Sequence, residues 1–485
     1  MTAELSLAQR SSLPDAQNEN PCVRSLPQIT AEARRYAVKE LARRAGVSRD
    51  FFDTWRIEVL TDSTVISLPG ESRRTLRFVH GEQSSSSGLN TDDIPVARAG
   101  WPDESRAVQT EKDLILPFCA SETDDRQPLY FFPDREAAIC RLDLLSSFLL
   151  TLSRFEETLC STLDQHNRFP ARASVAFRHG FLHRPILDEH GIALEQVLSA
   201  MLPGWKPEPR ILRVKLTHDV DDVGIPFRLR NAFGHTLKRR NVSATIRDLI
   251  ASCTPTEPTE LSLVRYLGAI SQERGLHSTF YWKSAPSGAF DSGYNPRDPK
   301  LQKVIESLRN VGFEMGVHPG YDTFRDRAAL ASEVEYLRQA LKTGSLGGRQ
   351  HYLRWSPNTW LDWETCRLLY DSSVGFADAL GFRAGTAFPY RPWSLREDRE
   401  LNLIELPLIL MDCAPVKYLK LRHHDGLVKI EDLIKRVART GGVFTLLWHN
   451  TPLLDPDYDG WYPAVLDMLE GAEGCQLPDP VQDLW

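Results

Sequence analysis

The sequence predicts an α/β protein in which a parallel sheet flanked by helices follows a smaller α+β region. Three observations predict it. Residues 205–475 contain seven short apolar segments with helical stretches between most of them, and strand–helix alternation implies a parallel sheet with right-handed crossovers. Segments such as 443–448 are apolar throughout, which suits a sheet covered on both faces. The length of 485 residues allows two or three domains.

The N-terminal part divides into a tail and a module. Residues 1–25 are rich in Ser, Gln, Asn and Pro, a composition typical of disorder. Strong helix formers predict a helix over 31–45. Strands are expected at 55–60, 75–79, 114–118 and 129–132, a polar loop at 80–99, and helices over 135–163 and 188–202. The Pro-containing connector 205–210 marks the boundary, so we expect an α+β module over 26–204 and a second domain over 205–475.

The second domain shows a more regular alternation of predicted strands and helices. Its expected strands lie at 212–218, 277–283, 313–318, 349–353, 373–376, 403–409 and 443–449. Two helices between them show a one-sided apolar pattern, the first with Leu301, Val304, Ile305 and Leu308 and the second with Leu330, Val334, Leu337 and Leu341. The Pro- and aromatic-rich link 381–399 is expected to be a long loop.

Composition excludes several classes of function. The formal net charge of −7 argues against nucleic acid as the main ligand, because a phosphate backbone needs a basic surface. No apolar run is long enough to span a membrane, and the N-terminus has no apolar secretory segment. Eight scattered cysteines without a Cys-x-x-Cys pair are typical of free thiols in a reducing compartment, so we expect a cytoplasmic protein. The sequence does not predict an oligomeric state.

Chemistry-bearing residues follow four of the predicted strands, at the end where parallel barrels place their ligands. They are Asp219, Asp221 and Asp222 after the first strand, His318, Tyr321 and Asp322 after the third, Arg349, His351 and Arg354 in the fourth, and Trp448 and His449 in the last. Three acids within four residues repel one another, and a divalent cation removes that cost. Taken singly, the acids could cap a helix, the histidines could be structural, and the arginines could pair with acids. Their coincidence at one edge favours a metal site with oxygen and imidazole ligands, suited to zinc or a neighbouring metal.

From residue 210 to 471 the chain resembles the polysaccharide deacetylase (NodB homology) superfamily, whose fold is a distorted (β/α)7 barrel. The resemblance implies that Asp219 is the catalytic base, that Asp221 and His318 bind the metal, that Arg349 or Arg354 holds the base, and that His449 in Leu-Trp-His is the general acid. Asp322 stands where the family has a second histidine, so the implied third ligand is an oxygen, and zinc, manganese, iron and cobalt all remain open. Asp222 could replace Asp221 as the ligand.

The match is closest to a bacterial subgroup with a His-Asp-Val-Asp motif and an N-terminal module of no assigned activity. The motif stands at 218–221, and further subgroup stretches match at 371–378, 381–386 and 448–450. Residues 153–157, 167–170 and 182–186 resemble signatures of the module. The resemblance therefore extends over most of the chain.

The function implied is that of a metal-dependent hydrolase acting on carbon–nitrogen bonds other than peptides. It would remove N-acetyl, or O-acetyl, groups from a sugar or polysaccharide precursor in bacterial surface polysaccharide metabolism. Substrate contacts are expected from Tyr321, where a backbone N–H would stabilise the oxyanion, and from Arg383, Trp393 and Trp448. The aromatic loop with Trp393 could equally be a hydrophobic plug. The alternatives are a non-catalytic carbohydrate-binding or assembly protein on a degenerate barrel, and another metal hydrolase such as a phosphoesterase.

Overall fold

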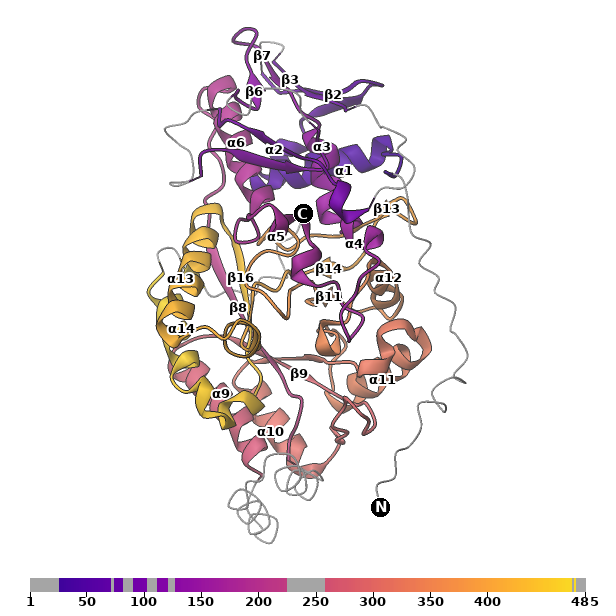
Figure 1. The fold of residues 1–485 in the computed structure, drawn as a ribbon, viewed down its shortest axis with the longest axis vertical. Coiled ribbons are helices and arrows are strands. Elements are labelled where there is room, and N and C mark those ends of the chain that lie inside the picture. The colour runs from indigo at the N-terminus through magenta and orange to yellow at the C-terminus, as the bar shows by residue number, and fades with distance from the viewer. Residues whose placement is uncertain are drawn as a thin grey trace, which may run out of the picture.

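The computed structural model describes residues 26–70, 74–81, 90–102, 111–120, 127–224, 258–472 and 475–476. The disorder expected for residues 1–25 lies outside these ranges. No helix among the described residues has both the length and the apolar character needed to cross a bilayer. The molecule is of the α/β class, and Figure 1 shows the N-terminal sheet at the top with the parallel strands of the C-terminal half below it.

The N-terminal region combines a mixed sheet with packed helices. Its helices are α1 (Ala31–Arg44), α2 (Arg49–Phe52), α3 (Leu144–Leu152), α4 (Phe155–Leu159), α5 (Val175–Arg178) and α6 (Ile186–Met201). Its strands are β1 (Arg56–Val59), β2 (Ser63–Ser67), β3 (Thr75–Val79), β4 (Val96–Ala99), β5 (Leu114–Pro117), β6 (Tyr130–Phe131) and β7 (Ala137–Cys140). One sheet has the order β1-β2-β3-β7-β6, and β4 pairs with β5. Helix α1 begins where the Thr30 hydroxyl accepts the N–H of Ala33.

The C-terminal half alternates parallel strands with covering helices. The helices are α9 (Thr259–Glu273), α10 (Pro299–Asn310), α11 (Arg327–Ala340), α12 (Pro357–Thr365), α13 (His423–Thr440) and α14 (Trp461–Glu470). The strands are β8 (Leu212–Asp219), β9 (Ser278–Trp282), β10 (Glu314–Val317), β11 (Tyr370–Asp371), β12 (Trp393–Ser394), β13 (Arg399–Glu400), β14 (Ile404–Glu405), β15 (Leu410–Met411), β16 (Gly442–Leu447) and β17 (Cys475–Gln476). Strand β8 lies at the centre and is buried along almost its whole length.

The strands of this half pair in parallel along one continuous path and its extension. The main path runs β10-β9-β8-β16-β15 with every pair parallel. Single parallel bridges from Val317 to Gly348 and from Gly348 to Asp371 extend it to β11, which pairs with β14. Among the described residues no ladder joins β14 to β15, so the pairs show the parallel α/β arrangement and leave the closed (β/α)7 barrel a prediction.

Several predicted elements differ from the structure. The helix predicted over 135–163 begins as a strand, β7, because residues 137–140 pair with β3 and β6 at the sheet. The helix starts only at Leu144, where Asp143 caps it by accepting the N–H of Ser146. Strands β2 and β4 were not predicted. The strand predicted over 349–353 is an extended bridge at Gly348 followed by a 3₁₀ turn, η6 (His351–Leu353), and the strand predicted over 373–376 lies earlier, at β11.

A buried ion pair of the N-terminal region is hydrogen-bonded to the C-terminal half. Arg44 of α1 donates to the carboxylate of Asp188 in α6 and to the hydroxyl of Thr386 in the C-terminal half. The second oxygen of Asp188 accepts the N–H of Ala387 at 2.8 Å. These groups are fully buried, so the C-terminal half supplies hydrogen bonds that the ion pair cannot obtain from water.

A second buried cluster crosses the same interface. Glu157 of α4 accepts hydrogen bonds from Arg154 at 2.9 Å and from Arg383 of the C-terminal half at 2.9 and 2.5 Å. Opposite charges outweigh the effect of burial and lower the pKa of Glu157. The three side chains are almost inaccessible to solvent, so the N-terminal region is held to the C-terminal half by a buried ion pair that supplies the carboxylate partner of Arg383.

We expect Glu157→Ala to destabilise the whole chain by about 3–5 kcal/mol, because it leaves the Arg383 guanidinium buried without its carboxylate. Denaturant unfolding of the full-length protein measures the change. Glu32→Ala is the matched control, because Glu32 pairs with Arg35 on the surface of α1 with 71% of its side chain exposed and should cost less than about 1 kcal/mol. Equal losses in the two variants would contradict an interface held by buried charge.

Candidate functional site

Strand β8 ends with Asp219 in a fully buried position. Nη1 of Arg349 donates to Oδ1 of Asp219 at 2.9 Å and to the Thr217 hydroxyl at 2.8 Å. The same guanidinium is fixed on its other side by Ser372, whose carbonyl and hydroxyl both accept from it. Burial raises the pKa of the Asp219 carboxyl, but the charges of His318 and Arg349 outweigh it and hold the pKa below the usual value. Asp219 is therefore ionised and held in one orientation by Arg349.

Three side chains converge beside Asp219 with the spacing of metal ligands. One donor atom each from Asp221, His318 and His351 lies within 4.8 Å of the others. Nε2 of His318 and Nε2 of His351 each lie 3.3 Å from Oδ1 of Asp221. Nε2 of His318 and Oδ1 of Asp221 are buried and have no hydrogen-bond partner. Two imidazoles and one carboxylate form the usual protein ligand set of a catalytic zinc ion, so these residues fit a divalent cation.

Neighbouring groups orient both histidines. Nδ1 of His318 donates to the carbonyl of Arg349 at 2.7 Å, which leaves Nε2 as the unprotonated nitrogen of the neutral ring. Nδ1 of His351 lies 2.7 Å from Oδ1 of Asp291, a carboxylate whose pKa is lowered by His351 and Lys283 against the effect of burial. A carboxylate behind a ligating histidine is a recurrent feature of metal sites.

The third member of this group differs from the sequence prediction. The side chain of Asp322 is exposed and lies outside the ligand group, because the chain after Gly320 enters a 3₁₀ turn, η5 (Tyr321–Arg325), that directs it to solvent. His351 lies in the group instead. It follows Gly348, where a Cβ atom would come within 2.0 Å of the Val317 carbonyl, so only glycine lets this segment lie against β10. Arg349 and His351, two residues apart, then both reach the site.

A buried lysine borders the ligand group. Nζ of Lys283, just after β9, lies 2.9 Å from Oδ1 of Asp291 and 3.6 Å from Oδ1 of Asp221. Burial raises the pKa of Asp221, but His351 and Lys283 outweigh it and hold the pKa well below the ordinary value. Lys283 and Asp291 were not predicted from the sequence.

His449 faces the same group from the opposite side. Its Nε2 lies 3.7 Å from Oδ2 of Asp221 and 4.0 Å from Oδ2 of Asp219. Its Nδ1 donates to Oδ1 of Asp412 at 2.9 Å, and its backbone N–H donates to Oδ2 at 2.7 Å. Burial lowers the pKa of the imidazole, but the charge of Asp412 outweighs it and raises the pKa to about 9. The imidazole of His449 is therefore protonated at neutral pH. With Cys413, these two residues form a second group of ligand-like spacing.

The residues predicted to bind substrate lie elsewhere. Arg383 is taken up by Glu157, Trp393 packs on Tyr36 with ring centroids 5.3 Å apart, and Trp448 packs on Tyr462 at 4.9 Å. All three are buried in contacts with structural partners, and for Arg383 and Trp393 the reason is that the long loop 381–399 packs on the N-terminal helices. That these residues contact substrate remains a prediction, and their buried contacts do not support it.

Tyr321 and Arg354 lie near the ligands without contacting them. The N–H of Tyr321 donates to Asp291 at 2.9 Å, so it is not free to stabilise an oxyanion. Arg354 stacks over the Tyr321 ring at 3.8 Å and donates to the carbonyls of Tyr321 and His166. Of the two arginine candidates, Arg349 is the one that holds Asp219.

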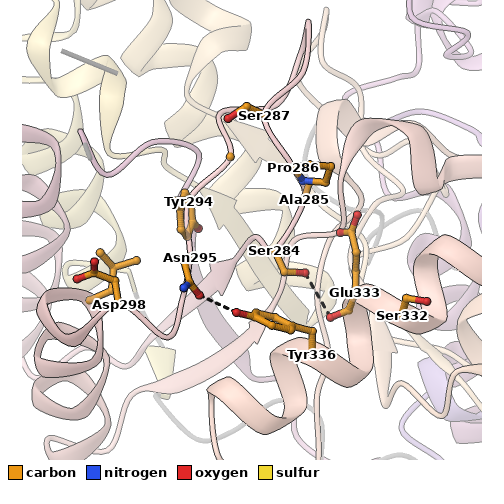
Figure 2. A pocket seen from close by; sticks show the side chains of 12 residues that line it. Ser284, Ala285, Pro286, Ser287, Tyr294, Asn295, Asp298, Ser332, Glu333 and Tyr336 are labelled. Carbon is orange, nitrogen blue, oxygen red and sulfur yellow. Dashed lines mark hydrogen bonds between the residues drawn. The ribbon is translucent and has the colours of Figure 1, made fainter. Parts of the chain in front are cut away.

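The molecule also has a cavity of about 600 Å³ beside the 284–295 loop. Figure 2 shows its lining, in which Tyr336 of α11 donates to Asn295 and Ser284 donates to the Glu333 carbonyl. None of the candidate ligands lines this cavity. The candidate site is therefore identified by the ligand-type residues at the strand ends and not by this cavity.

Comparisons with known proteins give a family match in the N-terminal part only. Residues 25–203 match a family of unknown function, DUF7033. No curated protein matches the chain.

Among solved structures, three similar ones come from hydrolase-type proteins. One from Mycobacterium smegmatis, assigned as a polysaccharide deacetylase, is 16% identical over 57% of this chain and 89% of its own, with a TM-score of 0.38. The PuuE allantoinase is 15% identical over 57% and 89%, with a TM-score of 0.38. A Bordetella bronchiseptica protein, assigned as a polysaccharide deacetylase of O-antigen biosynthesis, is 15% identical over 55% and 92%, with a TM-score of 0.27. The function proposed below rests on the geometry of the site.

We expect His351→Ala to lose the divalent ion, about one per chain, that the intact protein carries, because one of three protein ligands is removed. Asp322→Ala is the matched control and should keep it. Elemental mass spectrometry of the dialysed proteins measures the ion, and circular dichroism checks that both variants fold. Loss of metal from Asp322→Ala with retention in His351→Ala would restore the ligand set expected from sequence.

Proposed function

We propose that this protein is a metal-dependent hydrolase that removes an acetyl group, N-linked or O-linked, from a sugar or polysaccharide precursor. The observation that carries the proposal is the arrangement of three parts around one point. An arginine-held carboxylate, Asp219, lies beside a His–His–Asp ligand group, and a protonated histidine, His449, faces both at 3.7 to 4.0 Å. A base, a metal site and an acid are the groups that metal-dependent acyl hydrolysis uses.

The metal would be held by Asp221, His318 and His351. A divalent cation there supplies Lewis acidity, which activates water and stabilises negative charge on an acyl oxygen. We favour zinc, because two imidazoles and a carboxylate match its usual catalytic ligands more closely than the oxygen-rich set expected from sequence.

Two side chains of the chain would move the protons. Asp219 accepts a proton from the attacking water through Oδ2, since Oδ1 is engaged by Arg349. His449 donates the proton on Nε2 to the departing amine or alcohol, and Asp412 holds the opposite nitrogen and stabilises the charged ring. His449 can supply this proton at neutral pH because its pKa lies near 9.

The sugar substrate is supported by the sequence resemblance together with this acid–base arrangement. A nucleotide- or lipid-linked precursor on the cytoplasmic side is the substrate class we favour. A phosphoesterase is not favoured, because the cations beside the ligands are engaged: Arg349 with Asp219, and Lys283 with Asp291. A non-catalytic binding protein would purify without stoichiometric metal, since Lys283 would then offset the charge of Asp221 by itself.

We expect Asp219→Asn to keep the bound metal and lose about 10² to 10⁴-fold in kcat, the usual effect of removing a general base. Acetate release from a panel of N-acetylated sugars and nucleotide sugars measures the rate, and elemental analysis measures the metal. If the variant loses its metal, Asp219 is a ligand and the roles of the two aspartates are reversed.

We expect Asp412→Asn to shift the alkaline limb of the kcat/KM profile toward lower pH. The acid must be protonated to act, so activity falls as pH rises through the pKa of His449. Removing the charge of Asp412 lowers that pKa from about 9 toward the ordinary value of about 6.5. The surface variant Asp425→Asn on α13, whose partner is the exposed Arg422, is the control and should leave the profile in place. An unmoved alkaline limb in Asp412→Asn would assign it to another group.

A further inference from the structure

A short loop of the N-terminal region reaches the ligand group. The carboxylate of Asp164 accepts the backbone N–H of His166 at 2.8 Å and that of Arg168 at 2.9 Å, and it also pairs with the Arg168 side chain. Asn167 takes a left-handed conformation at φ 57°, which closes the turn. The loop is therefore ordered by its own hydrogen bonds and presents His166 as a buried side chain.

This loop is fastened to the residues that follow two of the ligands. Nδ1 of His166 lies 3.2 Å from the hydroxyl of Tyr321, three residues after His318. Arg168 donates to the carbonyl of Tyr352, the residue after His351, at 3.0 Å. Arg354 donates to the carbonyl of His166 at 3.0 Å. The N-terminal region thus contacts residues that follow the candidate ligands through three hydrogen bonds.

Tyr352 has an unusual backbone conformation. Tyr352 and Leu353 are consecutive non-glycine residues at φ 61° and φ 54°, directly after His351. Such residues cost about 1–3 kcal/mol each and persist where surrounding contacts hold them, most often at functional sites. Here Arg168 holds the Tyr352 carbonyl, so the N-terminal loop helps to fix the direction of the Tyr352 ring.

Aromatic rings gather around His166 at the edge of the site. Its ring centroid lies 4.6 Å from that of Tyr352 and 5.5 Å from that of Phe290. Phe290 stacks on Tyr321 at 4.2 Å and is 44% exposed, and Tyr352 is half-buried with its ring 4.6 Å from the ring of the ligand His351. A partly exposed aromatic surface with hydroxyl and imidazole groups therefore borders the metal ligands.

We propose that His166, Phe290 and Tyr352 form a wall that binds the sugar ring of the substrate, so that the N-terminal region takes part in substrate selection. Aromatic faces pack against the C–H face of a pyranose, and the tyrosine hydroxyl offers a hydrogen bond to a sugar hydroxyl. The inference rests on the proposed function, because it places the sugar whose acetyl group reacts at the ligands. It assigns to loop 164–168 a role in building this site.

The test uses the full-length, metal-loaded protein with N,N′-diacetylchitobiose and UDP-N-acetylglucosamine as sugar probes and 4-nitrophenyl acetate as an acetyl ester without a sugar. We expect Phe290→Ala and His166→Ala to raise KM, or the calorimetric Kd, for the sugar probe that binds by about tenfold, the equivalent of about 1.4 kcal/mol. The KM for 4-nitrophenyl acetate should change much less. Tyr352→Phe measures the contribution of the hydroxyl to sugar binding separately from that of the ring.

Two exposed residues of the N-terminal region serve as controls. Phe131 on β6 has the same exposed fraction as Phe290, 44%, and Phe131→Ala should leave both KM values in place. His179→Ala is the control for His166→Ala, because the His179 side chain is exposed. Equal behaviour of Phe290→Ala and Phe131→Ala, or an intact protein that binds neither sugar probe, would overturn the wall. Absence of metal and of all acetyl-ester turnover would instead count against the proposed function, while calorimetry still reports sugar binding.

Discussion

Negative charge buried at the carboxyl ends of the parallel strands is the constraint on which the C-terminal half depends. Three acids each have a cation within 3 Å: Asp219 with Arg349, Asp291 with Lys283, and Asp412 with His449. Asp221 has a more distant one, because its buried Oδ1 faces two histidine nitrogens at 3.3 Å and the Lys283 ammonium at 3.6 Å. A poorly compensated buried charge costs several kcal/mol, and a divalent ion among these atoms would remove that cost. Asp221 therefore shares Lys283 with Asp291 and is the acid whose charge a metal would compensate further.

The sequence located the strand ends well because the signal there is local. Asp219 ends a buried strand, Asp221, His318 and His449 lie within two residues of a strand end, and the structure brings the four together. The groups that orient them, Asp291 and Asp412, were not predicted, because a single sequence does not show which distant residues come into contact. His351 was visible beside Arg349, and its position two residues along an extended segment indicates a shared face. Asp322 was predicted because it stands where the resembled family has a second histidine, but Gly320 is extended before the 3₁₀ turn and the Asp322 side chain is exposed.

The fold also has elements that local sequence predicts and elements that depend on distant contacts. Amphipathic helices such as α10 and α11 were predicted because their periodicity depends on neighbours along the chain. Strand β7 was predicted as helix, because its apolar residues suit either state and the partners that decide, β3 and β6, are set by tertiary pairing. Arg383 and Trp393 were assigned to substrate because sequence shows their chemistry but not the direction of the loop that carries them. Their partners, Glu157 and Tyr36, lie more than two hundred residues away in the N-terminal region.

The same long-range contacts bear on why the two halves share one chain. A sugar-binding wall needs aromatic side chains held at a fixed distance from the ligands, and a loop of the C-terminal half alone would have to be rigid to hold them. Here the rigidity comes from the N-terminal region: Arg168 holds the Tyr352 carbonyl, and the His166 ring packs beside that of Tyr352 with centroids 4.6 Å apart. This support works only if the N-terminal region cannot shift, and the buried Arg383–Glu157 pair opposes a shift because separation would leave the Arg383 guanidinium without its carboxylate. The aromatic wall therefore depends on the ionic interface, since the interface fixes the position of the wall relative to the ligands.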